Sequence, residues 1–142
     1  MKPKTALMFV VLACTSGAAS SADPLPTVTA KPLERLPLTG IPGKEGLMLE
    51  VTVPAGASSA PHRHDADVFV YVLEGSVVMQ VAGGEPQTLG VGQTFHENPA
   101  DVHLRSENAS KTAPARLLVF FVKNVDVPAS RPAGPGGDAK AQ

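Results

Sequence analysis

Residues 56–75 read GASSAPHRHDADVFVYVLEG. From Val68 to Leu73 this stretch is a dense run of β-branched and aromatic residues, which is typical of a β-strand, and Gly75 predicts the turn that follows. The loop before the strand carries His62 and His64, two positions apart. In an extended chain such residues point the same way, so both imidazoles can reach one point. The stretch therefore predicts a strand preceded by a pair of candidate metal ligands.

Short apolar runs separated by Gly, Pro and Asn make up most of the remaining chain. Residues 47–53 alternate between an apolar and a more polar face, which is the period of a half-buried strand. Further strands are predicted at Val77–Val81, Thr88–Leu89, Thr94–Glu97, Val102–Arg105 and Leu117–Val122. No run of helical length repeats its apolar residues with a helical period. The pattern predicts an all-β fold, and a closed barrel or jelly roll also protects its sheet edges.

Two motifs together indicate a family. Residues 56–75 resemble the first motif of the cupins, G-x5-H-x-H-x3-E-x6-G, and residues 92–103, GQTFHENPADVH, resemble the second, G-x5-P-x-G-x2-H-x3-N. The resemblance covers roughly residues 45–123 and implies a single cupin barrel, a double-stranded β-helix of the jelly-roll type. It also implies that His62, His64 and His103 hold one divalent metal ion.

The first motif lacks its glutamate, because Val68 occupies that position. One interpretation is a site of three histidines with water in the open positions. Asp67 is a poor replacement, since a shift of one residue on a strand turns its side chain to the other face. Glu97 alternates in phase with Phe95, and in many cupins the matching position is apolar and faces the barrel interior. Glu97 is therefore a candidate fourth ligand or a candidate catalytic acid or base, with a solvated surface residue as the alternative.

Three other positions carry expectations of their own. His96 should face away from the site, as a surface or interface residue. Tyr71 shares a strand face with Phe69, which favours a packing role in the core or between sheets. Asn108 falls one place beyond the asparagine of the second motif, which we interpret as loop variation.

The first 22 residues have the layout of a secretory signal peptide. A basic start is followed by the apolar run Ala6–Ala13 and by small residues that predict cleavage after Ala22. The apolar run is too short to span a bilayer. Val11 to Cys14 also resembles a lipobox, in which Cys14 would be lipidated, as the less favoured alternative. The sequence predicts an exported protein, periplasmic or secreted, whose mature chain has no cysteine for disulfides or thiolate ligands.

Residues 23–44 and 124–142 differ in composition from the predicted barrel. Five prolines in residues 23–44 disfavour helix and predict an extended arm along the domain surface. Residues 124–142 are rich in Pro, Ala, Gly and charge, and we expect a disordered, flexible tail because their apolar content is low.

Charge and ligand type narrow the partners. Loss of Lys2 and Lys4 with the signal leaves 10 basic against 13 acidic residues, a net charge of −3. With no cluster of basic and aromatic residues, we expect no nucleic-acid partner. Imidazole ligands suit iron, manganese, zinc, nickel or copper. The positive charge of such an ion favours an anionic small-molecule ligand.

The family resemblance leaves the activity open, because cupins share a scaffold far more than a chemistry. We expect a small-molecule metalloenzyme of the dioxygenase, isomerase or decarboxylase type. The alternatives are a non-catalytic metal- or ligand-binding module and a metal-free structural barrel. Small cupins commonly pair their sheets, so the resemblance also implies a homodimer.

Overall fold

The computed structural model describes residues 26–99 and 101–134, which form ten strands and no helix. The strands are β1 (Thr29–Pro37), β2 (Lys44–Val53), β3 (His62–Arg63), β4 (Ala66–Glu74), β5 (Ser76–Val81), β6 (Gln87–Gly90), β7 (Thr94–Glu97), β8 (Val102–Asn108), β9 (Ala115–Asn124) and β10 (Arg131–Pro132). The predicted signal sequence and Cys14 lie outside the described residues. Within the described part of the chain no helix is long and apolar enough to cross a membrane.

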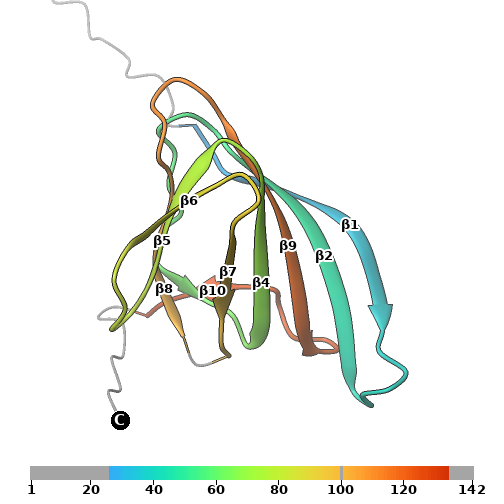
Figure 1. Cartoon of the computed structure of the whole chain (residues 1–142). Coiled ribbons are helices and arrows are strands. Elements are labelled where there is room, and N and C mark those ends of the chain that lie inside the picture. Colours follow the sequence, from blue (N-terminus) through green and yellow to red (C-terminus); the bar gives the residue numbers. More distant parts are fainter. Residues whose placement is uncertain (1–25, 100, 135–142) are drawn as a thin grey trace, which may run out of the picture.

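Two antiparallel sheets of five strands form the predicted jelly-roll barrel (Figure 1). One sheet has the order β1-β2-β9-β4-β7, and the other has the order β10-β3-β8-β5-β6. Alternation along each strand supplies the core between them: on β9, Ala115, Leu117, Val119 and Phe121 are all buried. The double-stranded β-helix expected from the sequence is confirmed.

The Pro-rich arm takes the form of an edge strand. β1 pairs with β2 over most of its length and lies at the outer side of its sheet (Figure 1). Proline cannot donate to a ladder, and an edge strand tolerates this because one of its sides has no neighbour. The ladder shifts register between Pro32 and Glu34. The extended conformation predicted for this arm is present in β1, where pairing with β2 stabilises it.

The C-terminal segment differs from the sequence expectation as far as residue 134. Arg131 and Pro132 form β10, which pairs with Arg63 and His62 of β3. Main-chain hydrogen bonds explain why this segment is ordered. One of them runs from the Ala133 amide to the Pro61 carbonyl (3.1 Å). This segment, residues 125–134, is called the C-terminal strap below. Residues 135–142 lie outside the described part.

Asn108 ties together the loops at one end of the barrel. Its side chain is buried, and Nδ2 lies 2.9 Å from the Val53 carbonyl and 2.8 Å from the Ala113 carbonyl. Its Oδ1 accepts from the Ser110 amide at 2.8 Å. The sequence-based interpretation of Asn108 as loop variation is therefore incomplete, because the side-chain amide supplies hydrogen bonds to main-chain carbonyl groups of other loops.

We predict that Asn108→Ala lowers the free energy of unfolding by about 2–4 kcal/mol, because it leaves buried carbonyl oxygens without donors. Urea unfolding followed by circular dichroism measures the change. Asn98→Ala is the control, since Asn98 is exposed. Equal stability of the two variants would contradict a tying role for Asn108.

Candidate metal centre

Two cross-strand pairs place the candidate residues on facing sheets. In one sheet, His62 of β3 lies directly opposite His103 of β8. In the other, Val68 of β4 lies directly opposite Glu97 of β7. His64 lies in the short connection between β3 and β4. Because β-strand side chains alternate, each pair presents its two side chains on the same face, toward the barrel interior.

The three predicted histidines converge. Ring centroids lie 4.8 Å apart for His62 and His64 and 4.9 Å apart for His62 and His103. One ligand nitrogen from each ring lies within 4.8 Å of the other two. His64 and His103 are buried, and His62 is partly buried. Three imidazoles at one interior point are a group that can hold a metal ion.

Main-chain carbonyls orient two of the rings. Nδ1 of His62 donates to the Ala60 oxygen (2.9 Å), and Nδ1 of His64 donates to the Ala129 oxygen (2.6 Å). A carbonyl can only accept, so the proton of each neutral ring resides on Nδ1 and Nε2 keeps its lone pair for a metal. Burial lowers the pKa of His62, and the charges of His103 and His64 lower it too. The hydrogen bond to Ala60 and the charge of Glu97 raise this pKa, but the net shift is downward. The neutral, ligating form is favoured.

Glu97 lies in the same interior space. Its side chain is 2% exposed, so the alternative of a solvated surface residue is wrong. Its Oε2 lies 3.2 Å from His103 Nδ1 and 3.8 Å from His64 Nε2. Within the described residues, Oε2 and both His103 ring nitrogens have no hydrogen-bond partner. A buried carboxylate and imidazole without partners are costly, and this donor set fits a divalent cation.

Strand alternation also places the excluded residues as expected. Asp67 and His96 project from the opposite face, where His96 Nε2 lies 3.7 Å from Asp67 Oδ1 and both side chains are more than 40% exposed. Val68, in the position of the motif glutamate, is fully buried. Asp67 therefore has no access to the centre.

A cavity of about 250 Å³ adjoins the four candidate donors. Its walls come from both sheets, and its lining also includes Val28 before β1 and Ala129 and Ser130 of the C-terminal strap. Sequence reasoning missed these three lining residues, because small and apolar side chains in Pro-rich segments carry no motif.

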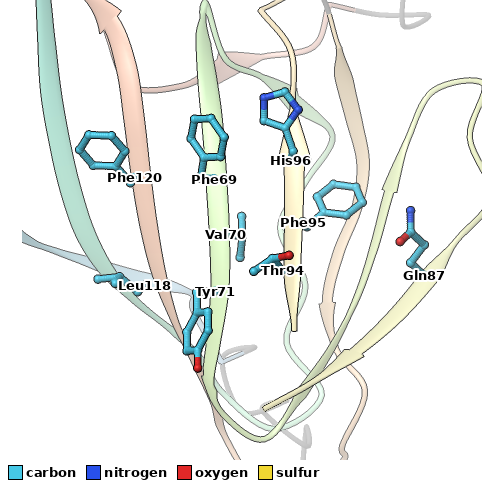
Figure 2. A pocket seen from close by; sticks show the side chains of 9 residues that line it. All are labelled: Phe69, Val70, Tyr71, Gln87, Thr94, Phe95, His96, Leu118 and Phe120. Atoms are coloured by element: carbon cyan, nitrogen blue, oxygen red, sulfur yellow. The ribbon is translucent and has the colours of Figure 1, made fainter. Parts of the chain in front are cut away.

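A second hollow, of about 550 Å³, lies on the outer face of the β4-β7-β9 region (Figure 2). Phe69, Tyr71, Leu118 and Phe120 are among its lining residues, and the first two are 49% and 44% exposed. The expected core role of Tyr71 is wrong, because Val68, Val70 and Val72 occupy the inner face of β4.

The two features described above, a jelly-roll barrel and three histidines that converge inside it, are those of a cupin. The family model described as Cupin domain matches residues 49–121, and the chain belongs to the cupin family. No curated protein matches the chain.

Solved structures share the fold at low sequence identity. The DMSP lyase DddQ from Ruegeria pomeroyi DSS-3 matches with a TM-score of 0.57 at 22% identity, over 66% of this chain and 45% of the lyase chain. A putative mannose-6-phosphate isomerase from Ralstonia eutropha JMP134 matches with a TM-score of 0.56 at 20% identity, over 69% of this chain and 86% of that chain. An RmlC-like cupin from Methanocaldococcus jannaschii matches with a TM-score of 0.55 at 13% identity, over 69% and 82%. This chain spans less than half of the lyase chain.

Arg131 holds the C-terminal strap to the loop beside His64, through Nε and Nη2 donating to the Asp65 carboxylate at 2.9 Å each. We predict that Arg131→Ala speeds hydrogen exchange of the Ala133 amide about two- to fivefold, the range for an exposed ion pair. Arg105→Ala is the control, because Arg105 pairs with Glu107 on its own strand. Equal exchange rates in the two variants would show that the ion pair does not hold the strap.

Proposed function

We propose that this cupin is a small-molecule metalloenzyme whose single divalent ion is held by His62, His64, His103 and Glu97. The convergence of three imidazoles beside a cavity, with the Glu97 carboxylate next to two of them, carries the proposal. Once bound, the metal would supply Lewis-acid or redox chemistry, and four protein donors leave positions for water and a substrate oxygen on a five- or six-coordinate ion.

The register of β4 and β7 supports Glu97 as the fourth ligand. Val68 occupies the motif position of the glutamate, and Glu97 is its direct cross-strand partner. Directly opposed residues have Cβ atoms about 4.5–5.5 Å apart on one face of a sheet. A carboxylate lost from β4 is thus supplied from the neighbouring strand, at the same level of the barrel.

The lining favours a dioxygenase type of reaction over the isomerase and decarboxylase types. The latter two commonly move a proton at the reacting carbon, which calls for a free acid or base. If Glu97 is a ligand, the remaining polar side chains that line the cavity within the described residues are Ser59, Ser106 and Ser130. The same observation favours the second candidate, a module that binds a metal and small ligand without turnover. Oxygen consumption by iron-loaded protein, measured in the presence of a panel of small organic compounds that can be oxidised, distinguishes the two.

We predict that Glu97→Val weakens metal binding at least about tenfold, and that the double variant Val68→Glu/Glu97→Val restores most of it by returning the carboxylate to β4. Competition with a chromophoric chelator measures the affinity. The double variant keeps one valine and one glutamate in the pair and only exchanges their positions. If Glu97→Val weakened metal binding by general damage to the core, this exchange would not restore it.

His103→Ala provides a second arm of this experiment, since it removes an imidazole and leaves the carboxylate. Unchanged metal content in His103→Ala would overturn the metal centre. Full affinity in Glu97→Val would make Glu97 an acid or base beside a three-histidine site.

We also propose that the outer hollow pairs with the same face of a second copy, as the expected homodimer requires. Phe69 lies beside both Phe120 and His96 in the sheet, forming a row across three strands (Figure 2). Exposed apolar patches mark interaction sites, and two sheet faces can stack about a two-fold axis.

Phe69→Asp should convert the dimer to a monomer, because it places a charge at the centre of this row in place of an exposed phenylalanine. Sedimentation velocity measures the mass. Ile41→Asp is the control, since Ile41 is 50% exposed in the loop between β1 and β2. A monomeric wild type would remove the proposal.

Export to the periplasm or the exterior of the cell is proposed from the sequence of residues 1–22 alone. Cleavage after Ala22 remains the favoured form, and lipidation of Cys14 remains the alternative.

A further inference from the structure

The interior cavity has an almost entirely apolar wall. Away from the four candidate donors, its lining is mainly apolar and includes Leu49, Val51, Val70, Leu117, Val119 and Phe121. Three serines contribute hydroxyl groups, and among the described residues that line the cavity there is no lysine or arginine. A ligand therefore finds electrostatic partners at the metal end of the cavity only.

Lys123 and Arg131 are engaged elsewhere. Arg63, whose Nε has no hydrogen-bond partner among the described residues, does not line the cavity. Lys123 is buried, but its Nζ donates to Glu45 Oε1 (2.6 Å) and to the Asn124 carbonyl (2.9 Å). Arg131 is bound to Asp65. Neither side chain lines the cavity. A negative group placed against the apolar wall would lose its hydration without gaining a counter-charge, which is strongly unfavourable.

Charge and volume limit the ligand further. A divalent ion with three neutral imidazoles and one carboxylate has a net charge of about +1, which one negative charge neutralises. A cavity of about 250 Å³ lies just below the range of about 300–1,000 Å³ that is usual for small-molecule sites. The site is thus matched to a compact molecule with a single charge.

We infer that the ligand of this site is a small monoanion, with one oxygen-bearing head at the metal and an apolar body along the wall formed by β2, β4 and β9. This inference rests on the proposed metal centre and adds its substrate class. Dianions and phosphorylated sugars are disfavoured, because their second charge has no partner.

The test compares hexanoate with adipate, which has the same chain length and a second carboxylate at the far end. Zinc-loaded protein is titrated with each by isothermal calorimetry, after its metal content has been measured. We expect hexanoate to bind at least about tenfold more tightly than adipate, since burial of an unpaired charge costs more than one decade of affinity.

Val51→Lys supplies the missing counter-charge. Val51 is only partly buried, so a lysine there can keep its ammonium group in contact with water. We expect Val51→Lys to narrow or reverse the preference for hexanoate, and the neutral Val51→Gln to leave it in place.

The outcomes separate the two proposals. Protein that takes up no zinc overturns the metal centre and with it the ligand class. Zinc-loaded protein that binds adipate as tightly as hexanoate, or binds neither, overturns the ligand class alone. A preference unaltered by Val51→Lys would show that charge at the wall does not select the ligand, and would likewise overturn it.

Discussion

The antiparallel register of the strands around the cavity is the constraint on which the rest of the structure depends. It sets His62 opposite His103 in one sheet and Glu97 opposite Val68 in the other. A slip of one residue in either pair would turn a polar group out of the interior and an outer side chain into it. The apolar core fixes this register, because the same strands must also bury their valine, leucine and phenylalanine side chains.

This arrangement concentrates polar atoms in a small volume of a largely apolar interior. Buried polar groups normally satisfy one another, yet Glu97 Oε2 and the His103 ring remain without hydrogen bonds among the described residues. By contrast, His62 and His64 each have one nitrogen fixed by a carbonyl. Two of the candidate donors are therefore oriented by the main chain, and in the proposed metal centre the ion would be the partner of the other two.

Local sequence predicted most of the strands and the three histidines, because alternation and motif spacing are both contained in short stretches. Local sequence could not predict the pairing of Val68 with Glu97. These two residues are 29 positions apart, and the register between their strands depends on the whole sheet. Local sequence failed for Tyr71, because the run from Val68 to Leu73 is apolar on both faces and alternation does not say which face is inside. The C-terminal strap was missed because main-chain hydrogen bonds hold much of it, and these leave no side-chain signature.

The bond between His64 and the Ala129 carbonyl joins residues 65 positions apart. The carbonyl that orients this histidine follows all three candidate histidines in the sequence. Because synthesis runs from the N-terminus, His62, His64 and His103 are present in a growing polypeptide before the group that fixes the proton on His64. The orientation of the His64 ring is therefore set only after residue 129 has been added to the chain.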